Sequence, residues 1–248
     1  DNSATCGQTA AGSRSGNRPN AKFIFSTYGC DGARAMVPVV VTGAPDNDAA
    51  ISWDDATDGS GSTYSSCAPI SLPVRVRNQG GVNMTDYSVV LSVDGDSVGI
   101  LNGSTTIVSG DSVVLNLPAY SFVPGRHVVS ARVVLSGDTV SSNDEISRIL
   151  SVRFCGGTYN VGPGTDFVTI SAATDTLNQV GMDGAVIFSI ASGTYNGQVS
   201  FGSFNGADSA NTVTFQSQTG NAEDVILTAT PTSTDNYVIS VDGSQHLS

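Results

Sequence analysis

Residues 157–162 read GTYNVG, residues 166–181 read DFVTISAATDTLNQVG, residues 186–201 read VIFSIASGTYNGQVSF, and residues 211–218 read NTVTFQSQ. One short amphipathic segment is followed by brief runs of Val, Ile, Phe and Thr, which Gly and Asn separate. The gaps between these runs are too short for further helices, so strand must follow strand. The pattern is typical of the first turns of a right-handed parallel β-helix.

Three phrases in this stretch carry a family resemblance: DF-x-TI-x-AA, G-x-V-x-F-x-I-x-x-GTYN and NTVTFQS. They resemble the start of the parallel β-helix domains of very large secreted and cell-surface proteins of Bacteroidota, which are relatives of the pectate-lyase superfamily. Adhesins, stalks and polysaccharide lyases share that scaffold. The resemblance therefore implies a fold and leaves the activity open.

The amphipathic segment predicts a short capping helix. Ser171 is a candidate N-cap, Ala173, Leu177 and Val180 recur at helical spacing, and Gly181 can end the helix. Such a helix can cover the open first turn of the coil with its apolar face. The following runs, VIFSI, QVSF, TVTFQ, VILTA and YVISV, are predicted to stack as parallel strands.

Residues 45–154 predict a second all-β unit, an Ig-like β-sandwich. Seven alternating runs follow one another at intervals of about 8 to 15 residues, with Gly, Asn and Asp at the turns. The runs are AISW, ISLPVRVRN, YSVVLSVDGD, SVGIL, DSVVLNL, RHVVSARVVLSGD and ISRILSVRF. In the sixth run, the face that carries Val129, Ala131 and Val133, together with His127 and Leu135, is predicted to point into the core.

Within that unit, VRVRNQGG (74–81), SVDGDSVG (92–99) and FVPGRHVVSARV (122–133) are similar to bacterial adhesion-type domains of the CARDB class. The resemblance implies a spacer or a binding module. The turn after RNQ is expected to need positive φ at Gly80 and Gly81.

Residues 1–44 contain two strand-like runs within NRPNAKFIF and MVPVVVTG. The NRPN-x-KF phrase is similar to the closing strand of jelly-roll-like domains, so we expect the C-terminal remnant of a preceding β domain. The third unit, residues 155–248, would leave unpaired strand edges if the coil ended at Ser248. We therefore expect the chain to be a segment of a longer polypeptide.

The composition indicates an extracellular protein. The chain has 10 Lys and Arg residues against 22 Asp and Glu residues, which gives a formal net charge of −12. No nucleic-acid partner is expected, because binding to phosphate backbones needs clustered cations. No run approaches the roughly 20 apolar residues of a membrane span.

Four cysteines, at positions 6, 30, 67 and 155, lack the C-x-x-C spacing of zinc or redox sites. Disulfides are favoured over free thiols, and three pairings are open. We favour Cys6 with Cys30 and Cys67 with Cys155. In the β-helix family that the chain resembles, a cysteine commonly lies where this sequence has Met182 and Asp183, and its absence leaves Cys155 for another partner.

Candidate catalytic and metal-binding residues are few. Both histidines, His127 and His246, are expected to be structural, and most carboxylates lie at turns such as Asp183-Gly184. No cofactor is expected. An acidic stretch gives a weak calcium candidate, although a solvated loop explains it better; its residues are Asp46, Asp48, Asp54 and Asp58. Trp53, among these acids, is expected to fill the sandwich core and not to stack on a sugar.

A repeated tripeptide, Asp followed by Ser or Thr and an apolar residue, resembles the acceptor motif for O-glycosylation of exported Bacteroidota proteins. Chance and the turn preference of Asp and Ser are an equal alternative. The candidate acceptors are Ser97, Ser112, Thr139, Thr176 and Ser209.

These features together predict a non-catalytic segment of a large cell-surface adhesin, stalk or filament, located on the outer face of the outer membrane. The resemblance implies export by the type IX secretion route. Other domains of the same chain, surface glycans and cell-surface or secretion proteins are the expected partners. The alternative is an ancillary N-terminal region of a secreted polysaccharide lyase or hydrolase.

Overall fold

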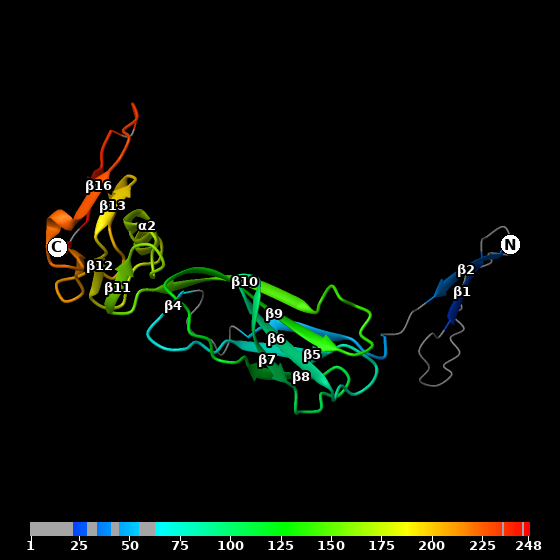
Figure 1. Ribbon diagram of the computed structural model, residues 1–248. Helices are drawn as coiled ribbons and strands as arrows, with labels where there is room; N and C mark the ends of the chain where they lie inside the picture. The colour runs from blue at the N-terminus through cyan, green and yellow to red at the C-terminus, as the bar shows by residue number, and fades with distance from the viewer. Residues whose placement is uncertain (1–21, 29–33, 41–44, 55–62, 235, 245) are drawn as a thin grey trace.

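The computed structural model describes residues 22–28, 34–40, 45–54, 63–234, 236–244 and 246–248 (Figure 1). The fold is mostly β with one α-helix among these residues. In chain order it consists of a hairpin, a two-sheet unit and a unit of parallel strands.

The N-terminal hairpin joins β1 (Lys22–Tyr28) to β2 (Arg34–Val40) as antiparallel strands, with Lys22 opposite Val40. These strands coincide with the two runs that were predicted within residues 1–44. The remaining residues of that predicted unit lie outside the described part of the chain.

The two-sheet unit is built from eight strands. One sheet has the order β3-β5-β8, and all its pairs are antiparallel. The other has the order β4-β10-β9-β6-β7, in which β4 and β10 are parallel and the other pairs are antiparallel. The strands are β3 (Ala49–Trp53), β4 (Thr63–Ser65), β5 (Pro73–Asn78), β6 (Tyr87–Val93), β7 (Asp96–Asn102), β8 (Ser112–Asn116), β9 (Gly125–Leu135) and β10 (Glu145–Arg153).

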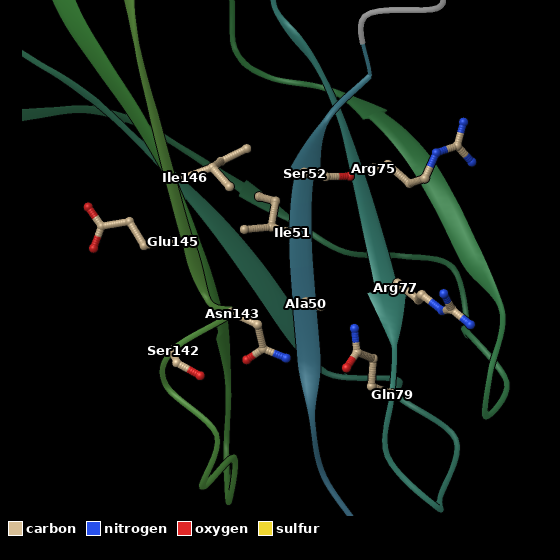
Figure 2. Close-up of a pocket in the computed structure, with 10 residues that line it drawn as sticks. All are labelled: Ala50, Ile51, Ser52, Arg75, Arg77, Gln79, Ser142, Asn143, Glu145 and Ile146. Carbon is tan, nitrogen blue, oxygen red and sulfur yellow. The ribbon is translucent and has the colours of Figure 1, made fainter.

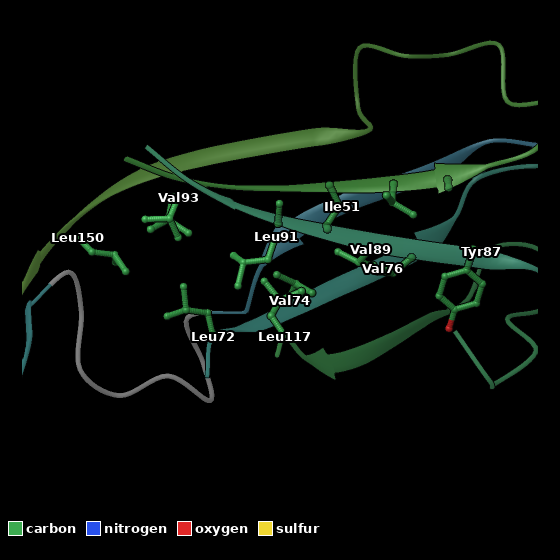
Figure 3. Packing of buried hydrophobic residues seen from close by; sticks show 14 of the residues in the cluster. Ile51, Leu72, Val74, Val76, Tyr87, Val89, Leu91, Val93, Leu117 and Leu150 are labelled. Carbon is green, nitrogen blue, oxygen red and sulfur yellow. The ribbon is translucent and has the colours of Figure 1, made fainter. Parts of the chain in front are cut away.

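Each of the seven predicted runs overlaps one of these strands, and β4 is the addition. The alternation of the runs determines which side chains form the core. Val89 and Leu91 of β6 and Val129 of β9 are at most 2% exposed, while the residues between them point to the other face of the sheet. Figure 3 shows Val74 and Val76 from the first sheet, with Leu117 just after β8, packed against Val89, Leu91 and Val93 from the second sheet.

The glycines of the RNQGG turn act differently from the prediction. Neither Gly80 nor Gly81 has a positive φ. Gly80 is required by space, because a Cβ there would lie 2.3 Å from the carbonyl oxygen of Asp46. Positive φ occurs instead in the next hairpin, at Asp94 (52°) and Gly95 (94°), as expected for a tight Asp-Gly turn.

The third unit consists of parallel strands in three small sheets, ordered β11-β12-β15, β13-β16 and β14-β17. In the first sheet, Tyr159, Phe188 and Phe215 lie opposite one another in register. The rings of Phe188 and Phe215 are stacked with centroids 4.8 Å apart. The strands are β11 (Gly157–Val161), β12 (Val186–Ile190), β13 (Gly193–Asn196), β14 (Val199–Phe201), β15 (Val213–Ser217), β16 (Val225–Thr228) and β17 (Ile239–Val241), with a 3-10 turn at Ala222–Asp224.

The one helix of the described residues is α2 (Ile170–Val180). Its predicted apolar face is correct, since Ala173, Leu177 and Val180 are buried, and Gly181 ends the helix with φ 75°. The predicted N-cap is wrong by two positions: the Thr169 hydroxyl accepts from Ala172 N–H at 3.1 Å. Ser171 lies inside the helix, where its hydroxyl donates to the carbonyl of Gln198.

Candidate functional site

The junction between the two larger units has no linker. β10 ends at Arg153, and the next side chain, Phe154, is fully buried in the core of the third unit. Phe154 N–H donates to the carbonyl of Gly181 at 3.0 Å, and its own carbonyl accepts from Asp183 N–H at 2.8 Å. The last strand of the sandwich thus leads directly into the third unit.

A disulfide lies at this junction. It joins Cys67 to Cys155, the pairing that the sequence analysis favoured, with Cα atoms 4.9 Å apart. Beside it, Ser66 N–H donates to the Arg153 carbonyl and the Ser66 hydroxyl accepts from Cys155 N–H, each at 3.0 Å. The other predicted pair, Cys6 and Cys30, lies outside the described residues.

Two further contacts hold the two sides of the junction together. The Arg153 guanidinium and the Asp183 carboxylate are 3.0 Å apart, and about a third of each side chain is exposed. The backbones of Gly156 and Gly184 approach so closely that a Cβ on Gly184 would lie 2.8 Å from Gly156. The predicted turn at Asp183-Gly184 is therefore a contact point, and a side chain at Gly184 would force the strands apart.

The calcium candidates are not brought together. Asp48 and Asp54 lie at opposite ends of β3 and are both buried. Asp48 accepts from the Asn143 amide at 2.8 Å, whereas Asp54 pairs with the Arg75 guanidinium at 2.9 Å. Asp46 is exposed, and Asp58 lies outside the described residues. Among the described residues, no three His, Cys, Asp or Glu side chains are placed to hold a metal ion.

A groove of about 460 Å³, lined by both polar and apolar residues, lies along β3 (Figure 2). Arg75, Arg77 and Gln79 line it from β5 and the turn after it, and Asn143 and Glu145 line it from the start of β10. Exposed and buried positions alternate along β5, so these arginines point away from the core. The β9–β10 loop also lines the groove through Asn143, and this neighbourhood depends on the spatial order of the strands, which local sequence does not contain.

Trp53 packs partly buried against the sandwich core, as expected. The Arg148 guanidinium lies 4.4 Å from the centre of its ring, which is a cation–π distance. This contact ties β10 to β3, the strand that leads toward β4.

His127 serves a structural role on β9. Its Nδ1 lies 2.7 Å from the Asp94 carboxylate and its Nε2 lies 2.9 Å from the carbonyl of Val123. Both partners are oxygen atoms, one of a side chain and one of the backbone. Partial burial acts to raise the pKa of Asp94, but hydrogen bonds from His127 and Val128 N–H, together with the charge of His127, lower it. His246 is exposed, and its carbonyl accepts from Val213 N–H.

The five candidate O-glycosylation sites differ in accessibility. Ser97, Thr139 and Ser209 are exposed, whereas Ser112 and Thr176 are half-buried. The Thr176 hydroxyl donates to the carbonyl of Ala172 within the helix at 2.8 Å, so it is the least available.

No family model matches the chain, and no curated protein matches its sequence. Solved structures with a similar fold include a domain described as part of a cell surface protein of Methanosarcina acetivorans, with 15% identity, 43% of this chain and 91% of that domain covered, and a TM-score of 0.35. Another is the CARDB domain of the PF1109 protein of Pyrococcus furiosus, solved with di-metal ions, with 17% identity, 44% and 89% covered, and a TM-score of 0.34.

The fibronectin(III)-like modules of Clostridium thermocellum CbhA are also similar, with 16% identity, 54% and 64% covered, and a TM-score of 0.31. Separately, no helix within the described ranges has the length and apolar character of a membrane span.

Proposed function

We propose that this chain is a non-catalytic spacer segment of a large cell-surface protein, in which the sandwich and the third unit hold a fixed mutual geometry. The junction is the observation that carries the proposal. Phe154 passes from strand to core without a linker, and the Cys67–Cys155 disulfide together with the Arg153–Asp183 ion pair restrains the same point. Several restraints at one junction favour a stiff connection over a flexible one.

The third unit supports the same proposal as the start of a parallel β-helix. Its strands pair in parallel, and aromatic rings repeat in register in the first sheet. The pairs are β11 with β12, β12 with β15, β13 with β16 and β14 with β17. A stack of this kind depends on its nearest neighbours and forms rods. The finer assignments, namely a Bacteroidota source, type IX export, the outer face of the outer membrane and an adhesin or filament role, rest on the sequence resemblance.

Distance measurements between spin labels test the rigid junction. Labels attached through unnatural amino acids at Ile100 and Ile226, which are 60% and 52% exposed on β7 and β16, report across the junction. A pair of labels at Ile100 and Val134, both within the sandwich, gives the width of the distance distribution that is expected for a rigid body. We expect distance distributions of similar width. A distribution across the junction that is several times broader would contradict the spacer proposal.

The groove along β3 supports a second candidate function, binding of a surface glycan that carries carboxylates. Arg75 is already anchored by Asp54, while Arg77 is exposed in the same groove as the amides of Gln79 and Asn143. Guanidinium groups and amides are suited to sugar carboxylates and hydroxyls. Titration with acidic oligosaccharides should give saturable binding that Arg77→Ala removes and that Arg126→Ala, outside the groove, leaves unchanged. No saturable binding by the wild-type chain would end this candidate.

Glycosylation remains part of the proposal for the exposed acceptors. Peptide mass spectrometry of natively produced protein should find added hexose-type mass at Ser97, Thr139 or Ser209. Unmodified peptides at all three positions would end the idea.

A further inference from the structure

The position of the disulfide in the chain determines how tension passes through the sandwich. Coming from the N-terminal side, the chain runs through β3 and β4, reaches Cys67, and is joined there to Cys155 at the start of the third unit. Cys67 and Cys155 are 88 positions apart, and β5 to β10 lie between them. The strands from β5 to β10 therefore form a closed covalent loop beside the direct path.

We propose that the Cys67–Cys155 disulfide carries tension past the sandwich, so that the loop between the two cysteines stays unextended when the two ends of the protein are pulled apart. The use of such a device rests on the proposed spacer function, because only a segment under tension needs it. The covalent path itself depends on the disulfide alone.

The core shows how much of the sandwich is protected in this way. Of the buried hydrophobic residues that form its core within the described part of the chain, Ala49 and Ile51 precede Cys67, and all the others lie between Leu72 and Val152. Both sheets also have most of their strands inside the loop, since β3 and β4 are the strands that precede Cys67. Tension on the direct path can detach β3 and β4 but cannot draw out the strands that form most of the core.

Without the disulfide, the same pull would act on a weak point. β4 and β10 are parallel and pair over three positions, from Thr63 opposite Ser151 to Ser65 opposite Arg153. Pulling β4 from its N-terminal end and β10 from its C-terminal end would shear this short pairing. The disulfide joins the two strands just beyond their C-terminal ends, so that they cannot slide past each other.

The expected lengths are large enough to measure. An extended chain spans about 3.4 Å per residue, so a loop of this size withholds about 300 Å of contour length. The segment from residue 45 to residue 66 can add only about 75 Å by the same estimate. Oxidised and reduced protein should therefore differ by about 300 Å in the extension that accompanies unfolding of the sandwich.

Single-molecule force spectroscopy on the full chain, tethered by peptide tags at both ends, tests the proposal. Unfolding of the third unit, residues 156–248, releases about 320 Å by the same estimate in either redox state. In oxidised protein we therefore expect one step of about this length, and we expect a second long step, from the sandwich, to appear after treatment with dithiothreitol. The double variant Cys67→Ser/Cys155→Ser should show the second long step under oxidising conditions and should not respond to dithiothreitol. If the variant does not fold, the comparison of oxidised and reduced wild type remains decisive.

Two results would overturn the proposal. One is a second long step in wild-type protein for which thiol titration finds Cys67 and Cys155 oxidised. The other is its absence after complete reduction, which would show that the loop resists tension without the disulfide. Neither result bears on the width of the spin-label distances across the junction, so failure of this inference is distinguishable from failure of the spacer proposal.

Discussion

In the sandwich, strands that are far apart in the chain pair with each other, as β4 does with β10, and one core lies between two sheets. In the third unit, each strand of the first sheet pairs in parallel with the next one in that sheet, and Phe188 lies on Phe215 at the same register position. A sandwich of this kind must close long loops before its core forms, and a covalent loop lowers that entropic cost. The stack instead depends on parallel pairing between neighbouring strands of each small sheet, such as β12 with β15 and β13 with β16. We therefore expect the two units to respond to different kinds of change.

The strongest test of this contrast removes the disulfide. The double variant Cys67→Ser/Cys155→Ser should lower the free energy of unfolding of the sandwich by about 4 to 5 kcal/mol, because the unfolded chain regains the freedom of a long loop. Fluorescence of Trp53, the single tryptophan of the chain, reports on this unit. Wild-type protein in reductant is the matched control and should agree with the variant. An unchanged unfolding midpoint would show that the loop closure adds no stability.

The complementary test removes a ring from the stack. Phe188 is fully buried and its ring lies within 6.2 Å, between centroids, of the rings of Phe154, Tyr159, Phe167 and Phe215. Phe188→Ala should destabilise the third unit by about 3 to 5 kcal/mol through lost burial and a cavity. Ile226→Ala, on the exposed face of β16, is the control and should change stability by less than about 0.5 kcal/mol.

Circular dichroism and Trp53 fluorescence together separate the two units in the Phe188→Ala variant. We expect the circular dichroism transition to move to lower denaturant while the Trp53 transition shifts less. If both transitions move together by the same amount, the two units unfold as one cooperative body, and the contrast between them does not extend to stability.

Much of the sandwich could be predicted from sequence because alternation has a physical cause. A strand with one face buried must alternate, so each of the seven runs overlaps a strand, and the predicted inward face of β9 is correct. β4 was not predicted because its three residues are too few to show alternation, and because it forms a strand through parallel pairing with β10, which is distant in the sequence. The N-cap was misplaced because Thr169 and Ser171 are both hydroxyl residues before the same apolar pattern.

The candidate site was harder to predict, since it depends on which segments meet in space. The pairing of Cys67 with Cys155 was one of three open choices. The groove combines Arg77 of β5 with Asn143 next to β10, and local sequence does not contain that neighbourhood. Gly80 was recognised as special for the wrong reason, because a close approach to Asp46 and a positive φ both exclude a side chain.

Adjacent glycines in the turn after β5 provide a smaller test within the sandwich. Gly80→Ala places a Cβ 2.3 Å from the carbonyl oxygen of Asp46, whereas at Gly81 the nearest such atom is 3.8 Å away. We expect Gly80→Ala to cost about 1 to 3 kcal/mol, as overpacking does, and Gly81→Ala to be nearly neutral. Chemical denaturation monitored at Trp53 measures both. Equal losses of stability from the two substitutions would contradict the conclusion that Gly80 is required because of its close approach to the Asp46 carbonyl oxygen.

The smallest expected effect concerns two carboxylates of the sandwich whose pKa values move in opposite directions. Burial raises the pKa of Asp144, and the nearby Asp138 and Asp48 raise it further against the opposing effect of Arg132. A carboxyl with a raised folded-state pKa contributes stability at low pH and loses that contribution as the pH rises through the folded-state value. Asp144→Asn, which imitates the protonated form, should therefore stabilise the sandwich at pH 7 by up to about 1 kcal/mol.

The matched variant is Asp94→Asn, because the pKa of Asp94 is lowered and the pH dependence of its contribution to stability is therefore opposite. The stability that Asp94 contributes is present above the unfolded pKa and is lost as the pH falls through the folded pKa. Asp94 is half-exposed, so we expect a small loss at pH 7 that shrinks as the medium becomes acidic. Denaturation midpoints at Trp53 between pH 3 and pH 7 should show the gain of Asp144→Asn growing with pH, while Asp94→Asn becomes more harmful. The same pH dependence for both variants would contradict the opposite pKa shifts of Asp144 and Asp94. Stability that depends on a raised pKa and stability that depends on a lowered pKa must change with pH in opposite directions.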